Sequence, residues 1–558
     1  MVAHYSGCQK VRMFNAPTFN IPLGSEVSGD DPLGLAPVNE RLYGSVFPGI
    51  NNVVRYIRVY SLLSWASWKF KEYLIKHPAG LSTEDVTNLY RQIHEKIELL
   101  ITWSNNESGT IVGLVGTNRV FPDDDRLVNL CFEAFGSNEA AYMAAVQYRP
   151  SITNGLSFLQ GAEHDTFICT HDGELLAKAV DDVLRSSSHY EWLSNITASK
   201  VRRSQVIELS PMLDLLKPSE QEKSIFLSRL IPEIDNAEDE SLDANRRAGM
   251  ILTLRAILSI NTSNRQNKVV DIGASEAQIR AVMARGCGLD GNLLNLDGVD
   301  VTQAKWAVLQ LRQYQRACYE AFYIGLEYVL SDLNNIADRS KTGVALLMGE
   351  LCERAFESGK ELVVKDLNQE VIKLQGEYET LYQAALVETK ADVFSRRLEL
   401  LDSDVEVSEE YGMPLLAHAI EGLVFCAKEV ENLMLNKRMR PYLRLDEDKK
   451  SLASLPGLVS KFKDSPIREM VIHVVMRDVI DRHYEVVAMR SRNGDEKNRF
   501  RFIESDVGLR RYDDSRGLPS LNEAQDRLAR ALDLLEQCEL LIRNDQGYIL
   551  TAHGNRWT

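Results

Sequence analysis

The chain has 558 residues, of which 44% are hydrophobic and 26% are charged, and its formal net charge is −16. This composition excludes a broadly disordered chain, and the length predicts several domains with cores of their own. An acidic chain is repelled by nucleic acid unless basic residues cluster locally, so the composition also disfavours a protein that coats DNA.

The cysteine spacing and the length of the apolar runs predict where in the cell the protein resides. Residues Met1 to Arg12 lack a long apolar stretch, and no run of about 18 uncharged apolar residues occurs, so we expect neither a signal peptide nor a membrane span. The eight cysteines include no C-x-x-C pair, which predicts free thiols and no zinc site. We therefore expect a cytoplasmic protein without membrane contact.

The first 200 residues divide into two parts. Residues 1–49 are rich in proline and glycine and predict an irregular N-terminal segment, with a short helix from Val38 to Val46. Residues 50–200 predict a helical domain, because apolar positions recur at helical spacing over 52–75 and Ser82 is followed by acids typical of a helix start. Phe167 to Thr170 is strand-like, and whether a winged-helix-like unit closes this domain stays open.

Residues 201–464 predict a central helical domain. Its longest predicted helix covers 302–333, where apolar residues occupy more than one face, as expected for a helix buried among its neighbours. Gly286 to Gly291 matches G-x-G-x-x-G, but a predicted helix rather than a strand precedes it. The glycines therefore indicate a helix end and a loop, not a dinucleotide site.

Residues 465–558 predict a C-terminal winged-helix domain. A helix at 466–489 and a strand at 499–503 precede a helix at 520–535. Residues 538–551 then alternate around the turn Asn544-Asp-Gln-Gly547, which predicts the β-hairpin of a wing. The fold class is thus mainly α, multi-domain, with a winged helix at the C-terminal end.

One short pattern occurs twice. Phe167-Ile-Cys-Thr-His-Asp-Gly173 and Tyr548-Ile-Leu-Thr-Ala-His-Gly554 both have the form aromatic-Ile-x-Thr-x-x-Gly. The alternating residues suit a last wing strand, the threonine suits a helix cap, and the glycine supplies a permissive backbone position. This shared pattern is the reason to consider a second winged-helix-like unit near residue 170.

No arrangement of residues indicates catalysis. The sequence contains no P-loop, no H-x-x-x-H pair and no G-x-S-x-G turn, so we expect a protein that is not an enzyme and that needs neither a cofactor nor a metal. The predicted recognition helix carries Glu523, Asp526 and Asp533 beside Arg527 and Arg530, and this mixed charge favours protein contact over base reading.

Two groups of basic residues are candidates for contact with DNA or a partner. The first group occupies eight residues without an acid, and the second surrounds the helix end and strand that precede the predicted recognition helix. They comprise Lys437, Arg438, Arg440, Arg444, Arg490, Arg492, Arg499 and Arg501.

Both ends of the chain carry a resemblance to a known family. Leu42-Tyr-Gly-Ser-Val-Phe-Pro-Gly-Ile-Asn51, Arg55-Tyr-Ile-Arg58 with Ser64-Trp65, and Ala531-Leu-Asp-Leu-Leu535 with Leu550-Thr-Ala-His-Gly554 resemble accessory subunits of bacterial defence operons that also encode an SMC-like ATPase and a nuclease. The similarity is to the Lamassu type and its anti-plasmid Ddm relatives.

The resemblance implies a kleisin-like subunit that bridges the ATPase heads or couples them to the nuclease, and that has no catalytic residues to carry over. We therefore expect a non-catalytic scaffolding subunit of a bacterial anti-phage or anti-plasmid DNA-defence complex, in contact with DNA through the complex. The alternative is a free-standing DNA-binding regulator that uses the C-terminal winged helix.

Overall fold

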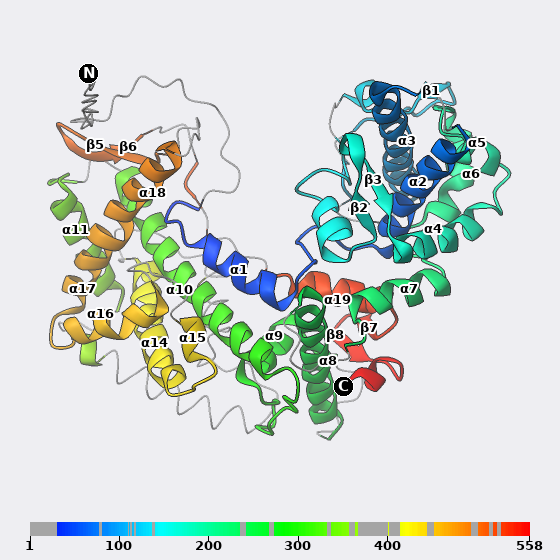
Figure 1. Ribbon diagram of the computed structural model, residues 1–558. Helices are drawn as coiled ribbons and strands as arrows, with labels where there is room; N and C mark the ends of the chain where they lie inside the picture. Colours follow the sequence, from blue (N-terminus) through cyan, green and yellow to red (C-terminus); the bar gives the residue numbers. More distant parts are fainter. Residues whose placement is uncertain are drawn as a thin grey trace, which may run out of the picture.

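The computed structural model describes residues 31–558 except 78–80, 110, 112–113, 117–118, 137–139, 235–240, 267–272, 332–335, 357–362, 367–399, 401–412, 444–450, 493–499, 513–516, 520 and 522–525. The fold is mainly helical, as predicted. Each sheet of the described residues is a two-stranded antiparallel pair. Two lobes stand apart and are joined through a central layer of helices (Figure 1).

The first lobe is built around α2, which packs against α3 and α4. Ser82 accepts a hydrogen bond from Asp85 N, and the Asp85 carboxylate accepts from Ser82 N, so the predicted helix start is a capping box. The elements of this lobe are α2 (Ile57–Lys76), α3 (Thr83–Ser108), β1 (Val128–Asn129), η1 (Phe132–Phe135), η2 (Ser151–Gly155), β2 (Leu159–Gly161), η3 (Glu163–Asp165), β3 (Phe167–Cys169), α4 (His171–Leu184), α5 (Tyr190–Ser194), β4 (Lys200–Val201), α6 (Arg203–Leu213) and α7 (Glu220–Leu230).

The central layer combines segments from both ends of the chain and its middle. The helix expected at Val38 is present as α1, which packs along α10 and α8. The elements of this layer are α1 (Ala36–Val46), α8 (Leu242–Gln266), α9 (Glu276–Arg285), α19 (Leu528–Gln537), β7 (Leu541–Asn544), β8 (Gly547–Leu550) and η7 (Gly554–Trp557). Helix α9 ends at Gly286, whose φ of 69° is left-handed, so the first glycine of the G-x-G-x-x-G match ends a helix as expected.

The second lobe surrounds α10, which is buried along most of its length between α14, α1 and α9. This burial agrees with the apolar residues on more than one face of the predicted helix. The elements of this lobe are α10 (Asp300–Ser331), α11 (Lys341–Ala355), α14 (Pro414–Met434), α15 (Arg440–Leu443), η5 (Leu452–Ser454), α16 (Leu455–Lys461), α17 (Ile467–His473), η6 (Val474–Ile480), α18 (Asp481–Arg492), β5 (Phe502–Ser505) and β6 (Gly508–Arg511).

The segment expected as one C-terminal domain, 465–558, contributes to two places. Elements α17, α18, β5 and β6 pack in the second lobe, where Arg339 O accepts from Leu509 N at 2.7 Å. Elements α19, β7 and β8 belong to the central layer (Figure 1). Of the helix expected over 520–535, residues 520 and 522–525 lie outside the described residues. In the described part, α19 begins at Leu528, directly after Arg527, whose backbone is left-handed with φ of 69°.

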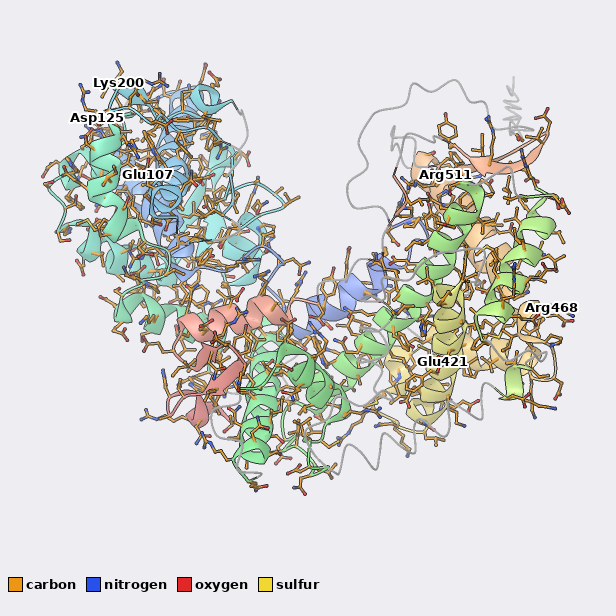
Figure 2. All side chains as sticks on the ribbon, turned by 180° about the vertical axis from the view of Figure 1, so that it is seen from behind. Glu107, Asp125, Lys200, Glu421, Arg468 and Arg511 are labelled. Carbon is orange, nitrogen blue, oxygen red and sulfur yellow. The ribbon has the colours of Figure 1, made fainter. Side chains whose placement is uncertain are left out.

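Figure 2 shows the two lobes from behind, with Glu107 and Lys200 on the first lobe and Glu421 and Arg511 on the second. Seven of the eight cysteines lie in the described part of the chain and are free thiols. Within that part, no helix combines the length and the apolar character that crossing a bilayer requires.

Candidate functional site

The two copies of the repeated pattern form hairpins with the same hydrogen bonds. We call residues 149–173 hairpin unit A and residues 528–554 hairpin unit B. In unit A, Thr170 N donates to Phe158 O at 3.0 Å, and in unit B, Thr551 N donates to Leu540 O at 3.1 Å. The threonine hydroxyls donate to the same two carbonyls, each at 3.1 Å. The sequence repeat therefore corresponds to a structural repeat.

A steric constraint explains why each copy of the pattern ends in glycine. Gly173 N donates to the Thr170 hydroxyl at 3.2 Å, and Gly554 N donates to the Thr551 hydroxyl at 2.9 Å. A Cβ on Gly173 would lie 1.9 Å from the Phe158 carbonyl oxygen, and one on Gly554 would lie 2.2 Å from the Leu540 carbonyl oxygen. Both contacts are far inside van der Waals distance, so only glycine fits.

Each hairpin also follows a residue that the repeat did not indicate. Ser157, directly before Phe158, has φ of 56°, and Glu539, directly before Leu540, has φ of 60°. Neither is a glycine or an asparagine, the residues that usually mark a left-handed position. This turn was therefore not visible in the sequence.

Hairpin unit B is completed by residues from far upstream. Ala274 exchanges two backbone hydrogen bonds with Tyr548, at 2.8 and 2.9 Å. This antiparallel bridge places Ala274 beside β8 of the hairpin. Asn261 of α8 donates to Tyr548 O at 3.2 Å and accepts from Leu550 N at 2.9 Å. Helix α9 begins directly after Ala274, at the N-cap Ser275, and packs on α19.

A buried ion pair fixes α9 to the residue that leads into α19. Arg280 donates from Nε and Nη2 to the two carboxylate oxygens of Asp526, at 2.6 and 3.2 Å. Gln310 of α10 donates to the same carboxylate at 3.2 Å. The side chains of Arg280 and Asp526 are 6% and 2% exposed, so the pair is shielded from water and salt. Residues 286–525, which include most of the second lobe, are thus inserted between two helices that touch.

The polar side chains of α19 are used by the chain itself. Gln537 donates to Arg55 O at 2.6 Å and accepts from Ile57 N at 2.9 Å. The Gln537 amide therefore satisfies one of the first backbone N–H groups of α2, which has no partner within its own helix. In this way α19 caps the first long helix of the other end of the chain.

Two arginines extend this contact. Arg527 donates to Phe47 O at 3.3 Å and lies over the ring of Tyr43, 4.7 Å from its centroid. Arg530 donates to Asn52 O at 3.0 Å. Burial lowers the pKa of Arg527, while the nearby Tyr43 opposes this shift. We call the contact between α19 and residues 47–57 the junction.

Unit A meets the other side of the same segment. Gly49 and Gly155 approach so closely that a Cβ on Gly155 would lie 2.4 Å from Gly49 Cα. Directly before unit A, Tyr148 Oη accepts hydrogen bonds from Arg55 N and Tyr56 N at 3.0 and 3.2 Å. Residues 47–57 are therefore held between the two hairpin units.

The fully buried Arg246 of α8 completes the junction. Its Nη1 donates to Pro48 O at 3.4 Å and to Gly155 O at 3.1 Å, and its Nη2 donates to Arg229 O at 2.8 Å. Burial lowers the pKa of Arg246, and Asp243 opposes that shift. One cation thus joins α8, unit A and the segment that follows α1.

Two of the segments that carry the family resemblance, 42–51 and 55–58, contribute Phe47 and Ile57 to the junction, and the α19 residues that contact this stretch, Arg530 and Gln537, lie on either side of 531–535. Residues 42–51 and 55–58 come from one end of the chain, and 531–535 lies in α19 near the other end. Every residue of α19 is buried or only partly exposed. Gln537 and the Arg280–Asp526 pair were not identified from the sequence, since nothing local marks their partners.

The first group of predicted basic residues lies at the start of α10. Lys437, Arg438 and Arg440 are exposed. Arg438 Nη1 pairs with Asp300 Oδ2 at 3.0 Å, and the side chain of Arg438 remains 66% exposed. This group is therefore accessible to a partner.

The described residues of the second group differ in burial, and Arg501 among them lies against the end of α10. Arg501 donates to both carboxylate oxygens of the buried Glu327, at 2.9 and 3.0 Å. Arg490 lies 3.7 Å from Asp31 and is partly buried, whereas Arg492 is exposed. Arg501 therefore serves the packing of the second lobe.

The structure separates the two groups. Asp300 and Glu327, which pair with Arg438 and Arg501, are both on α10, about 40 Å apart at 1.5 Å per residue. The predicted residues therefore do not form one continuous basic surface. Arg444 and Arg499 lie outside the described residues.

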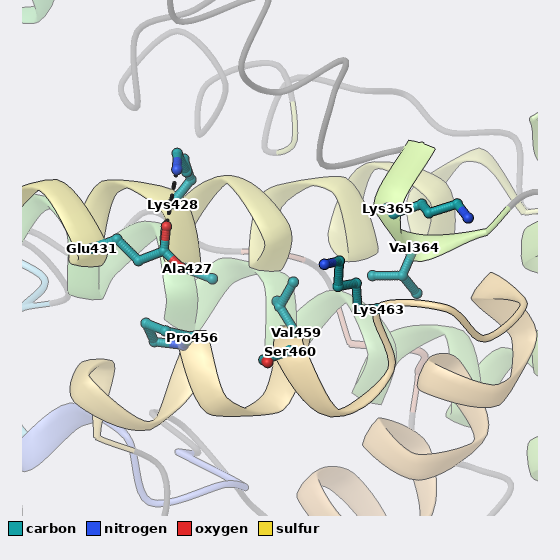
Figure 3. A pocket seen from close by; sticks show the side chains of 9 residues that line it. All are labelled: Val364, Lys365, Ala427, Lys428, Glu431, Pro456, Val459, Ser460 and Lys463. Atoms are coloured by element: carbon teal, nitrogen blue, oxygen red, sulfur yellow. Dashed lines mark hydrogen bonds and ion pairs between the residues drawn. The ribbon is translucent and has the colours of Figure 1, made fainter.

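A groove lies between α14 and α16 (Figure 3). Its volume is about 240 Å³, and lysines and apolar side chains line it. Across the described residues, no cluster of three or more histidine, cysteine, aspartate or glutamate side chains could hold a metal ion. No protein-family model, no curated protein and no solved structure matches the chain.

Proposed function

We propose that this chain is a non-catalytic bridging subunit of a bacterial DNA-defence complex in the cytoplasm, and that it links an SMC-like ATPase to a nuclease. The observation that carries the proposal is the junction, where segments from both ends of the chain meet. The junction joins the first lobe to the central layer, and α1 packs along α10 of the second lobe. A connection between two separate lobes is what a bridging subunit requires. The resemblance of residues 42–58 and 531–554 to Lamassu-type accessory subunits supplies the identity of the partners.

In this proposal the C-terminal winged helix is a discontinuous module. Its three helices would be α8, α9 and α19, and its wing would be the β7–β8 hairpin with Ala274 beside it. That order of three helices and a hairpin is typical of winged-helix modules. The second lobe would then be an insertion between the second and third helices, held by Arg280 and Asp526.

The alternative function, a free-standing regulator that reads DNA, requires an open recognition helix. Base reading depends on side chains that reach the edges of the bases in the major groove. Arg527, Arg530 and Gln537 instead donate to backbone carbonyls of residues 47–55, and α19 has no exposed residue. The net charge of −16 also opposes approach to the phosphate backbone.

Co-purification from the native host tests the proposal. The full chain, tagged at its C-terminus, is expected to bring down the SMC-like ATPase and the nuclease in constant ratio through a salt wash. Recovery of the tagged chain alone would contradict the proposal.

A gel shift with the full chain and a short duplex tests the alternative in parallel. The proposal predicts weak binding without sequence preference. Tight, sequence-specific binding that weakens steeply with salt would favour the regulator.

A further inference from the structure

The groove between α14 and α16 has an apolar floor and a basic rim. The floor consists of Val364, Ala427, Pro456 and Val459. Val364 and Ala427 are buried by the fold, while Pro456 and Val459 are partly exposed. A groove of about 240 Å³ between two helices can accept one or two apolar side chains of another molecule.

The rim carries three lysines, Lys365, Lys428 and Lys463, and one acid, Glu431. These four side chains carry a net charge of +2, and Asp464, which pairs with Lys365, lowers the net charge around the groove to +1. Lys428 lies 3.0 Å from Glu431, and Lys365 lies 3.7 Å from Asp464. These pairs are in contact with water, so an incoming carboxylate can compete for the lysines.

The same face of α14 leads to a large exposed apolar side chain. Ala427, Glu431 and Leu435 follow one another at intervals of four residues, and at 100° per residue they fall within an arc of about 80°. Leu435 is the C-cap, keeps a helical backbone and is 85% exposed. An exposed leucine beside a groove extends the apolar surface that a partner could cover.

Basic residues continue beyond Leu435. Lys437, Arg438 and Arg440 are all exposed, and Arg438 pairs with Asp300. Lys437, Arg438 and Arg440 follow Leu435 closely along the chain. We call the groove, Leu435 and these three residues the α14 strip. Its charge is positive, although the chain as a whole is strongly negative.

We propose that the α14 strip binds an acidic segment of a protein partner, with an apolar side chain of that segment in the groove and its carboxylates against Lys463, Lys437 and Arg440. The apolar floor and Leu435 favour a peptide over DNA, because a phosphate backbone has no apolar group to cover them. This inference deepens the proposed function, on which it rests, by naming the surface that holds one partner.

Photo-crosslinking in the native host tests this assignment. Benzoylphenylalanine replaces Leu435 in the full chain, and the control replaces Val120, which is 86% exposed on the first lobe. The expected adduct at position 435 is an operon-encoded partner, and its crosslinked peptide is rich in aspartate or glutamate next to an apolar residue. The Val120 control is expected to give no such adduct.

Charge reversal tests whether the lysines of the α14 strip hold the captured segment through its carboxylates. The double variant Lys437→Glu with Lys463→Glu is expected to lower the yield of the adduct at least tenfold. Glutamate-to-lysine changes in the captured segment are expected to restore it. Both lysines are exposed, so the double variant should keep the thermal unfolding midpoint of the parent chain.

The outcomes separate this inference from the proposed function. An adduct to DNA, a crosslinked peptide without acids, a yield that the double variant leaves unchanged, or no adduct at position 435 would each overturn the assignment of the α14 strip. If the ATPase and nuclease co-purify but position 435 captures neither, only this inference fails. If they do not co-purify with the parent chain, the proposed function fails.

Discussion

Replacement of Asp526 by alanine tests how the inserted lobe is held. The carboxylate of Asp526 accepts hydrogen bonds from Arg280 and Gln310, and from Leu528 N at the start of α19 at 3.3 Å. In Asp526→Ala these donors lose their acceptor inside a buried site. We expect α9 and α19 to separate more easily, because no other described side chain links them in this way.

The size of the effect follows from burial. Removal of one member of a buried ion pair destabilises a protein by about 3–5 kcal/mol. Arg280 also pairs with Glu276, which is 37% exposed and stays in place, so we expect the lower end, about 3 kcal/mol. At roughly 2–4 °C per kcal/mol, the midpoint of the transition that opens the central layer should fall by about 6–12 °C.

The assay is thermal unfolding of the full chain, with Asp533→Ala as the matched control. Asp533 is also on α19, but it is 21% exposed and pairs with Arg530 within the same helix. An ion pair of that kind contributes about 0.5 kcal/mol, so the control should shift the midpoint by only ~1–2 °C. Equal shifts in the two variants, or no shift in Asp526→Ala, would refute the role assigned to the buried pair.

Two further predictions concern the stability of the fold at low pH and the glycine of hairpin unit B. Burial lowers the pKa of His483 to about 4 and that of His94 to about 3, against 6.5 in the unfolded chain. The unfolded chain therefore binds protons that the folded chain does not, and stability should fall as the pH drops from about 7 toward 4. The His483 share is about 3 kcal/mol, and His483→Gln should flatten the plot of unfolding midpoint against pH, whereas an unchanged slope would contradict its burial. Gly554→Ala should destabilise unit B by about 1–3 kcal/mol in the same assay because its Cβ would meet Leu540 O. The control Gly457→Ala, which has no atom within 4 Å of the new Cβ, should be neutral or slightly stabilising, and equal losses in the two variants would count against the steric argument.

Local chemistry made part of this fold predictable. The helical content, the capping box at Ser82 and the hairpin around Asn544 all follow from spacing and residue type over a few positions. The repeat of aromatic-Ile-x-Thr-x-x-Gly indicated two related hairpins, because the threonine and glycine have local hydrogen-bonding and steric roles.

The arrangement of these elements was not predictable from one sequence. Arg280 and Asp526 are 246 residues apart, and no periodicity records which helix faces which at that separation. The break directly before α19 was not predictable because Arg527, an ordinary residue for a helix, adopts a left-handed backbone. The basic residues were grouped by position in the chain, whereas α10 holds Arg438 and Arg501 near opposite ends.

We propose that this chain connects an SMC-like ATPase to a nuclease. The most direct test of this proposal is purification through a tag on the ATPase, from cells that carry the gene for this chain and from cells that lack it, with quantification of the nuclease by mass spectrometry. The account predicts that the nuclease is recovered with the ATPase only when this chain is present. Recovery of the same amount of nuclease without this chain would contradict it.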